Sequence, residues 1–393
     1  MNVSGCSKIT DEGVKGLCVS VDYYGREDSR LGKCKLIEKL ATSGTRITNV
    51  GKKILLDNLH DLKIWDDVHF GFLSEMFKSD PYLLKNPPSY SFTQLELRQN
   101  SFFSFNSLRL GVSLCPFLNK IKIKVVNGLM DSDILSLLSL KNLYKLIING
   151  FDEKDQNGGI TFIGGIIPLL KCFGCSLAKL NLSHLHDVNI LLIAQLCPNL
   201  RSLKLKENWS YLTADRTEEY KYRSNQTNKP ILQSLEELIL ICDFSAYVPF
   251  IPIPPDNIVI LLSSPSLTYV SIVGCGNLTD EVLQEAAKIH NFEKLVNLEI
   301  FYCKSVTKKG IDIFLTNRNP LKKIELLSCR RLTKEDVRCW KRKKKEENWD
   351  LNIDVGLTPD VPIASESETS SESESDSELS SFCDSANDWS DEY

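Results

Sequence analysis

The residues best suited to chemistry are cysteines and histidines that lie close together in the chain. Cys172 and Cys175 form a C-x-x-C pair, and His184 and His186 follow a short distance later. Two thiolates and two imidazoles are a ligand set that can bind Zn²⁺. The residues between the two pairs, however, read as a strand around Leu180–Leu182, and about four strand residues span roughly 13 Å, far beyond zinc–ligand distances. We therefore expect no metal site here.

A second set of cysteines recurs with a constant spacing to threonine. Thr follows Cys by four residues in Cys6/Thr10, Cys275/Thr279, Cys303/Thr307 and Cys329/Thr333. Apolar residues alternate before these cysteines, as in "LEIFYC" at 298–303. We interpret the four cysteines as small, buried apolar side chains at the turn of a repeat, rather than as ligands or nucleophiles. The same interpretation covers Cys115 and Cys197, which recur in "SLCPFL" and "QLCPNL".

No enzyme motif accompanies these residues in the sequence. The chain has no Gly-rich phosphate loop, no G-x-S-x-G elbow and no H-E-x-x-H pair, and its five His are scattered. We therefore expect a protein that is not an enzyme and that needs no cofactor.

The elements that would position these side chains are short strands. An L-x-x-L-x-L pattern recurs at 59–64, 92–97, 118–123, 143–148, 177–182, 200–205 and 235–240. Its period of two sends the aliphatic side chains to one side and their neighbours to the other, which predicts one strand for each copy. In the copies that carry Cys, the Thr would cap a following helix, whose first turn carries Asp or Glu.

A single strand–helix unit cannot bury its own apolar side, so the units must stack. A period in the twenties, with Cys or Asn after the strand, is the leucine-rich-repeat signature. The sequence therefore predicts an α/β leucine-rich-repeat solenoid over residues 1–356, curved, with short parallel strands on the concave face and helices outside. Residues 357–393 are predicted to be a disordered, acidic, Ser-rich tail.

Two stretches carry a resemblance to a known family. "GCGNLTDEV" at 274–282 and "QLCPNLRSLKL" at 195–205 resemble the cysteine-containing repeats of F-box/LRR proteins. The resemblance covers most of 1–356. It implies the substrate-binding part of an SCF-type ubiquitin-ligase receptor, which directs protein ubiquitination and proteasomal degradation.

One departure from that family concerns the F-box, which usually precedes the repeats, whereas Met1 here falls inside a repeat. We therefore expect either a truncated gene product or isoform, or a chain without ligase docking. The cullin–RING ligase adaptor is an expected partner only if an F-box lies upstream. The alternative function is a stand-alone leucine-rich-repeat scaffold or inhibitor without a ligase link.

The outward strand positions are the candidates for partner binding, since they would line the concave face. The basic and polar candidates, toward the N-terminal half, are Trp65, Arg98, Lys122, Lys124, Lys204 and Lys206. The apolar candidates, toward the C-terminal half, are Ile239, Ile241, Tyr269, Val273, Phe301 and Leu327. Clustered, exposed apolar side chains are typical of a binding surface, so we expect a protein substrate or ligand on this face. The alternative is that these side chains lean on one another or are covered by an inserted segment.

Charge is divided unevenly along the chain. Of its 51 acidic residues, ten lie in 366–393, which has no Lys or Arg, and the rest of the chain carries 47 basic against 41 acidic residues. Each phosphate added to this tail would contribute about −1.5 to −2 charges. Such a tail is a candidate to compete for a basic surface of a partner or to fold back on the basic patches of its own chain. The alternative is a solubilising tail without a specific partner. Seven hydroxyl residues with an acidic residue three positions later resemble casein kinase 2 sites: Ser365, Thr369, Ser371, Ser373, Ser375, Ser381 and Ser385.

The sequence also bears on localisation. No apolar run approaches the roughly 18–20 residues that cross a bilayer, and no secretory signal is visible, so we expect a cytoplasmic and/or nuclear protein with no membrane partner. The basic run Lys341–Lys345 is a candidate nuclear-localisation signal, and its alternative is a solvated helix end. We do not expect nucleic acid as a partner, because no aromatic stacking platform accompanies these lysines.

Overall fold

The computed structural model describes twelve stretches of the 393 residues, and every structural statement below concerns them. They are 1–18, 20–21, 27–28, 36–79, 87–98, 107–124, 128–150, 159–208, 210–212, 232–242, 252–315 and 320–356. The chain divides into two units, Met1–Leu357 and Thr358–Tyr393, and only the first contains described residues. The predicted disordered tail and its seven phosphorylation candidates lie outside the described residues.

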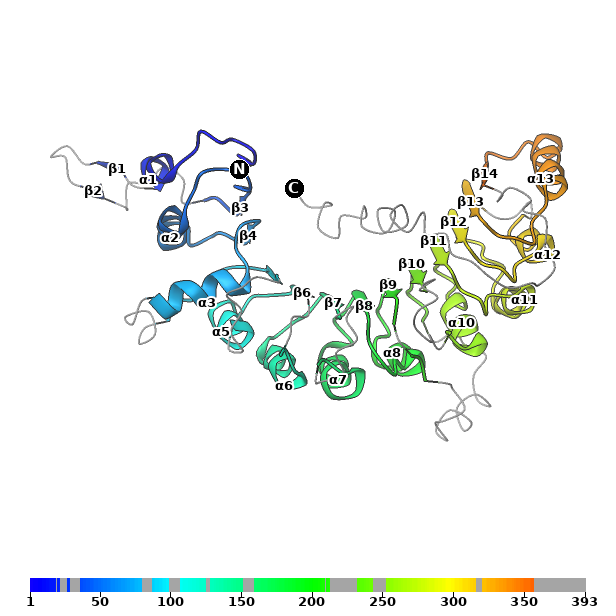
Figure 1. Cartoon of the computed structure of the whole chain (residues 1–393), viewed down its shortest axis with the longest axis horizontal. Coiled ribbons are helices and arrows are strands. Elements are labelled where there is room, and N and C mark those ends of the chain that lie inside the picture. The colour runs from blue at the N-terminus through cyan, green and yellow to red at the C-terminus, as the bar shows by residue number, and fades with distance from the viewer. Residues whose placement is uncertain are drawn as a thin grey trace, which may run out of the picture. The chain divides into compact units, whose positions relative to one another are not determined.

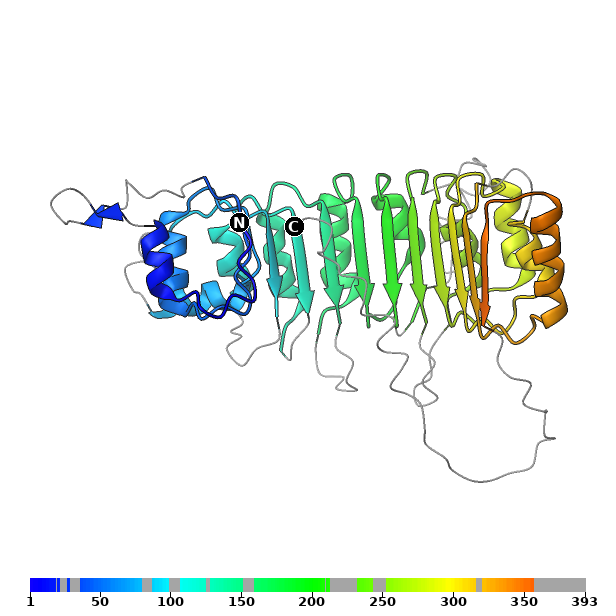
Figure 2. The ribbon, with the colours of Figure 1, turned by 90° about the horizontal axis from the view of Figure 1, so that it is seen from above.

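Ten parallel strands, in unbroken chain order, form the main sheet (Figure 2). Corresponding positions pair between neighbours, so that Leu203 lies opposite Leu238 and Leu298 lies opposite Ile324. This register is the one that the repeat predicts. The strands are β5 (Gln94–Leu97), β6 (Lys120–Lys124), β7 (Lys145–Asn149), β8 (Lys179–Ser183), β9 (Ser202–Lys206), β10 (Glu237–Ile241), β11 (Tyr269–Val273), β12 (Asn297–Phe301), β13 (Lys323–Leu327) and β14 (Asn352–Gly356).

The apolar core lies on the helix side of this sheet. The second and fourth residues of each strand point toward it, and Leu203, Ile272 and Leu298 are at most 1% exposed. The alternation has a simple cause, because successive side chains of a strand point to opposite faces. The chain is therefore an α/β leucine-rich-repeat solenoid, in which each repeat buries its aliphatic residues against the next.

Two shorter strands continue the stack toward the N-terminus. Strand β3 (Lys39–Leu40) pairs in parallel with β4 (Ile64–Trp65), and an isolated parallel bridge joins Asn2 to Ala41. The stack reaches the main sheet through the Thr93 N–H, which donates to the Lys63 carbonyl at 2.9 Å. A separate antiparallel pair is formed by β1 (Ser20–Val21) and β2 (Glu27–Asp28).

The predicted register of the β4 repeat is wrong. The sequence pattern places Leu62 and Ile64 inside and Trp65 on the concave face. In the structure the Lys63 and Ile64 N–H groups both donate to the Glu38 carbonyl, which aligns Ile64 with the first strand position and Trp65 with the inward second position. Trp65 is 3% exposed and its Nε1 donates to Thr42 Oγ1 at 2.7 Å, so it is a core residue. A shift of one residue turns every side chain of a strand to the other face.

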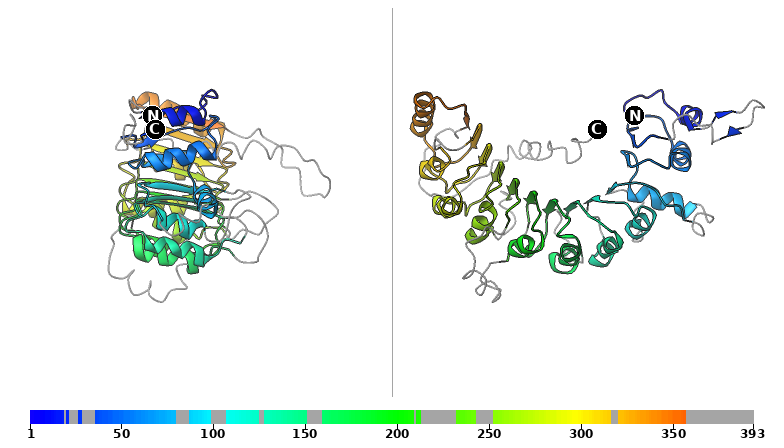
Figure 3. Two further views of the ribbon diagram at one scale, coloured as in Figure 1. Left: turned by 90° about the vertical axis from the view of Figure 1, so that its left-hand side faces the viewer. Right: turned by 180° about the vertical axis from the view of Figure 1, so that it is seen from behind.

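Helices follow the strands and lie on the outer, convex side (Figures 1 and 3). None of the helices in the described stretches is long and apolar enough to span a membrane. The α-helices are α1 (Asp11–Cys18), α2 (Asn49–Asn58), α3 (Phe70–Ser79), α5 (Ser107–Leu114), α6 (Asp131–Ile134), α7 (Ile167–Phe173), α8 (Ile190–Leu196), α10 (Pro255–Leu262), α11 (Asp280–Ile289), α12 (Lys308–Asp312) and α13 (Lys334–Glu346). A 3₁₀ turn, η2 (Leu135–Ser139), and a π turn, η3 (Phe162–Ile166), complete the set.

Threonine caps several of these helices, as the Cys–Thr spacing predicts. The Thr279 side chain accepts from the Val282 N–H at the start of α11, and Thr333 forms a reciprocal capping box with Asp336 at the start of α13. Such a cap satisfies backbone donors that have no partner within the helix. The first turn of α11 carries Asp280 and Glu281, which suits the positive end of the helix dipole.

The cap also joins one repeat to the next. Thr307 donates its N–H to Asp280 Oδ1 at 2.9 Å and its hydroxyl to Asp280 Oδ2 at 2.5 Å, so the first helical residue of one repeat holds the cap of the following repeat. Asp11 accepts the same pair of bonds from Thr48, and Asp131 accepts them from Thr161. The sequence pattern predicts a helix-dipole role for the acidic residues of the Cys-containing copies, such as Asp11 and Asp280, but it does not indicate this contact between repeats.

The turn cysteines bond the backbone at the strand ends. Cys303 Sγ–H lies 3.5 Å from the Phe301 carbonyl and 3.8 Å from the Ile272 carbonyl of the preceding repeat. Asn208 occupies the same position in its repeat and makes stronger hydrogen bonds than a thiol does. Its amide oxygen accepts from the Leu185 N–H, and its amide nitrogen donates to the Leu182 carbonyl. Burial is confirmed for Cys115, Cys197, Cys275, Cys303 and Cys329, whereas Cys6 is exposed, contrary to the prediction.

Candidate functional site

The candidate site is the side of the sheet that faces away from the helices. We call it the concave face, and it is formed by the first, third and fifth residues of strands β5–β14, on the inner side of the curve (Figure 1). Each of these strands is bonded to its neighbours along its whole length, so the backbone fixes the spacing of the side chains at about 4.8 Å from strand to strand. The face is therefore a rigid array of side chains.

Lysines dominate the part of this face that belongs to four consecutive strands, β6 to β9. We call these seven lysines the lysine strip: Lys120, Lys122, Lys124, Lys145, Lys179, Lys204 and Lys206. Their stems are partly covered, and Lys124 is exposed. Three of them, Lys120, Lys145 and Lys179, are direct cross-strand neighbours in the first row. Like charges directly opposite each other destabilise a sheet.

Acidic neighbours compensate part of the strip. Glu96 pairs with Lys122 at 3.4 Å and with Arg98 at 2.8 Å, and Arg98 also donates to the Asp66 carbonyl. At the other end, Glu207 lies 3.8 Å from Lys206 and 3.0 Å from His184 Nε2. Arg98, Lys122 and Lys206 are therefore placed on the concave face as predicted, but each has an acidic or carbonyl partner within the chain.

Three other lysines of the strip, Lys124, Lys179 and Lys204, have no ion-pair partner among the residues that the structure describes. Between them lies Asn181, opposite Ile147 on one side and Lys204 on the other. Asn181 is 9% exposed, and its side-chain oxygen is buried without a hydrogen-bond partner. A buried acceptor left without a donor costs free energy, on the order of 1–3 kcal/mol.

The apolar candidates toward the C-terminal half are only partly exposed. Ile241 and Val273, in the fifth row, are 6% and 8% exposed, so the prediction of an exposed apolar surface is wrong at these two positions. They are paired positions of the neighbouring strands β10 and β11. Ile239, Phe301 and Leu327 are half-buried and remain accessible on this face.

Tyr269 is also half-buried, and its hydroxyl donates to Glu299 Oε2 at 2.7 Å. Burial, and then this hydrogen bond, raise the pKa of the Tyr269 hydroxyl above its usual value. The hydroxyl is therefore protonated at neutral pH, and it binds Glu299 rather than an incoming ligand.

A row of carboxylates crosses the same C-terminal strands, and the sequence analysis missed it. Glu299, Glu325 and Asp354 occupy successive third-row positions, and Glu237 precedes them in the first row. Glu325 pairs with Lys323 at 2.7 Å, and Ser202 donates to Glu237 at 2.5 Å. The alternation of the repeat sequence could have predicted this row, because each of these carboxylates stands at an outward position of its strand. The concave face is thus basic over β6–β9 and acidic toward β14.

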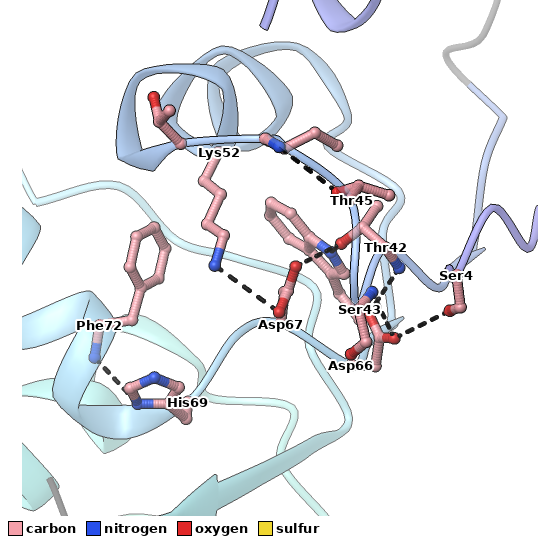
Figure 4. A network of polar contacts seen from close by, with 12 residues as sticks. Ser4, Thr42, Ser43, Thr45, Lys52, Asp66, Asp67, His69 and Phe72 are labelled. Atoms are coloured by element: carbon pink, nitrogen blue, oxygen red, sulfur yellow. Dashed lines mark hydrogen bonds and ion pairs between the residues drawn. The ribbon is translucent and has the colours of Figure 1, made fainter. Parts of the chain in front are cut away.

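A second polar cluster lies in the N-terminal repeats (Figure 4). Asp66 accepts from the Thr42 and Ser43 N–H groups at 2.8 and 3.1 Å, and Asp67 accepts from the Thr42 hydroxyl at 2.7 Å. Lys52 lies 3.6 Å from Asp67. These carboxylates are occupied by contacts between adjacent repeats, which indicates a structural role.

Beside this cluster, His69 Nδ1 accepts from the Phe72 N–H at the start of α3. Burial, with the cations Arg98 and Lys52 nearby, lowers the pKa of His69 to about 4. The imidazole is therefore neutral at physiological pH and serves as a cap for the helix.

The cysteines and histidines considered first do not assemble into a reactive site. Strand β8 separates Cys175 from His184, as expected from the sequence, and no group of three or more metal-ligating side chains occurs in the described stretches. Burial raises the pKa of Cys197 to about 12 and also raises the pKa of Cys303. Thiols of this kind stay protonated and are poor nucleophiles.

Comparisons with known proteins yield structural likeness only. No protein-family model and no curated protein matches the chain. The crystal structure of the yeast Rad7 and Elc1 complex contains a chain with 16% sequence identity, with 80% of this chain and 90% of that chain covered at a TM-score of 0.37. An LRR protein of Leptospira interrogans shares 15% identity over 91% of each chain at a TM-score of 0.33. The fold assignment therefore rests on the strand register and repeat contacts described above.

Proposed function

We propose that this protein is a non-catalytic recognition module that binds a protein partner on its concave face. The observation that supports this function is the combination, on one rigid array, of three unneutralised lysines, accessible apolar side chains and a row of carboxylates. A mixed surface of this kind offers electrostatic complementarity for specificity and apolar area for affinity. Buried, protonated thiols and structural carboxylates, by contrast, offer little for catalysis.

The finer proposal is that the partner is a substrate of ubiquitination. The G-C-x-x-L-T-D-E-V stretch and the turn cysteines support it, because they resemble the repeats of SCF-type ubiquitin-ligase receptors, which direct their substrates to proteasomal degradation. In that role the described repeats would supply only the substrate-binding surface. The cullin–RING ligase adaptor would bind through an F-box joined to them.

The alternative proposal is a stand-alone leucine-rich-repeat scaffold or inhibitor that uses the same face, in the nucleus or the cytoplasm. The basic run at the end of α13 supports a nuclear location, since Lys341, Arg342 and Lys345 are exposed. Part of the run has a structural role, because Lys343 donates to the Leu315 carbonyl and lies 5.1 Å from the ring centre of Trp349.

Affinity purification of the tagged full-length chain tests the function. We expect partners to be recovered with the wild type and lost with Phe301→Ala combined with Leu327→Ala, which removes accessible apolar area from the concave face. The matched control is Ile289→Ala, which removes an exposed aliphatic side chain from the end of helix α11. Recovery of the same partners from both variants would refute binding on this face.

The same purification separates the two finer proposals. Cullin and its adaptor in the eluate, together with a partner whose ubiquitination falls in the concave variant, support the ligase receptor. A partner recovered without cullin or adaptor, and with unchanged ubiquitination, supports the scaffold or inhibitor.

A further inference from the structure

The lysine strip concentrates positive charge on four neighbouring strands. The first-row neighbours Lys120, Lys145 and Lys179 stand on adjacent strands, spaced by about 4.8 Å. Like charges at directly opposite strand positions repel each other, and an anion bound between them relieves this repulsion.

The compensating carboxylates lie at the two ends of the strip. Glu96 is engaged by Lys122 and Arg98, and Glu207 by Lys206 and His184. Lys124 on β6, Lys179 on β8 and Lys204 on β9 keep an uncompensated positive charge within the described part of the chain. These three lysines are therefore the ones that are free to bind an anion.

Asn181 indicates what kind of anion fits. Its buried side-chain oxygen has no donor, and it lies in the middle of the strip, beside Lys204 in the third row. Carboxylate and phosphodiester groups carry acceptors only and cannot satisfy this oxygen. A polypeptide backbone can, because each residue other than proline brings an N–H group together with any acidic side chain.

We propose that the lysine strip binds an acidic, extended segment of a protein partner, laid across strands β6 to β9. Carboxylates of the segment pair with Lys124, Lys179 and Lys204, and one of its backbone N–H groups donates to the Asn181 oxygen. Four strands cover about 15 Å, which matches roughly five residues of extended chain at 3.3 Å each. This inference rests on the proposed function and names the chemistry of the partner.

Two features of the face favour a peptide over a nucleic acid. The described strand positions of β6–β9 carry no aromatic side chain on which a base could stack. The carboxylates Glu299, Glu325 and Asp354 farther along the face would repel a phosphate backbone that continued past the strip. A protein partner can instead present acidic residues to the strip and basic or apolar residues to the remaining strands.

Fluorescence anisotropy with the full chain tests the proposal. The probe is a labelled octapeptide of alternating Glu and Ser, and the control peptide carries Gln in place of Glu. We expect the Glu peptide to bind and the Gln peptide to bind at least tenfold more weakly, with an affinity for the Glu peptide that falls as salt is raised. No difference between the two peptides would overturn the proposal.

Matched triple variants locate the site. Lys124→Gln, Lys179→Gln and Lys204→Gln together should weaken binding about tenfold, because each exposed ion pair contributes a small factor. The control combines Lys141→Gln, Lys171→Gln and Lys294→Gln, which are exposed lysines outside the strands and change the net charge equally. Both variants keep the acidic C-terminal residues 366–393, so any effect of these carboxylates on peptide binding is the same in both. Equal weakening by both variants would show that only net charge matters.

Two further measurements complete the test. Asn181→Leu keeps the branched shape of the side chain but removes the acceptor, and we expect it to weaken binding of the Glu peptide about threefold while the folded state, followed by circular dichroism, persists. A labelled oligothymidine that binds the strip more tightly than the Glu peptide would overturn the choice of partner. If the peptide fails to bind while the Phe301 and Leu327 variant still loses its cellular partners, the proposed function stands and this inference fails.

Discussion

The contact of Asp280 with Thr307, between successive repeats, allows a specific prediction for Gly310 in helix α12. A Cβ atom on Gly310 would stand 2.4 Å from Asp280 Oδ1 and 3.0 Å from Leu283 Cδ1 of the preceding repeat. Real Cβ atoms do not approach a carboxylate oxygen this closely, so the Asp280 side chain would have to move. It could not then keep both bonds to the Thr307 N–H and hydroxyl.

The magnitude follows from three contributions. A hydrogen bond to a charged group contributes about 1.5–3 kcal/mol, and forcing an extra methyl group into a packed contact costs about 1–3 kcal/mol. Ala is favoured over Gly in a helix by about 1 kcal/mol, which offsets part of this loss. We expect Gly310→Ala to lower the free energy of unfolding by about 2 kcal/mol.

Urea unfolding followed by circular dichroism measures this change in the free energy of unfolding. Two controls separate the clash with Asp280 from the general preference of helices for Ala. Gly13→Ala, in helix α1, places a Cβ where nothing lies within 4 Å, so it should be stabilising by up to about 1 kcal/mol. In an Asp280→Ala background the obstructing carboxylate is gone, and Gly310→Ala should then stabilise the protein by up to the same amount. A stabilising Gly310→Ala in the wild-type background would refute the reasoning.

Three further predictions follow from the caps and the thiols. Thr279→Ala removes the acceptor of the Val282 N–H and should cost about 1 kcal/mol in urea unfolding, whereas Thr279→Ser should restore most of the loss. The pKa of His69 is lowered from 6.5 to about 4 in the folded protein, so as the pH falls the unfolded chain binds a proton first. We therefore expect the free energy of unfolding to keep the full contribution of His69 above pH 6.5 and to decline as the pH falls toward 4. His69→Asn, which keeps a cap for Phe72, should flatten this slope, and an unchanged slope would contradict the assignment. Thiol labelling of the native protein, read by mass spectrometry, should modify the exposed cysteines and spare the buried ones until urea is added. The exposed set is Cys6, Cys172 and Cys175, and the buried set is Cys18, Cys115, Cys197, Cys275, Cys303 and Cys329.

The fold could be predicted from the sequence because one alternation repeats many times. Where the pattern is clear, as at Leu203 and Leu298, the predicted inward side chain is in the core. At β4 the apolar residues Leu62, Ile64 and Trp65 satisfy two registers equally well. The choice between them depends on the Glu38 carbonyl of the previous repeat, which the sequence pattern does not specify.

The concave face was harder to predict, because alternation gives the side of a residue but not its neighbours. Ile241 and Val273 stand at outward positions of adjacent strands and are nevertheless buried. The contact of Asp280 with Thr307 and Gly310 joins residues of successive repeats. It becomes visible only when the stacking register is known, although Thr-x-x-Gly recurs at Thr48, Thr161 and Thr307.

The parallel register of β6–β9 has a consequence for how the molecule would respond to a ligand. In a solenoid each repeat is stabilised only by its two neighbours, so local opening can begin at any boundary between repeats. A peptide bound across β6 to β9, through lysines of β6, β8 and β9, would bridge three such boundaries at once. Amide protons in those strands would then exchange more slowly as a group, although the ligand touches side chains alone.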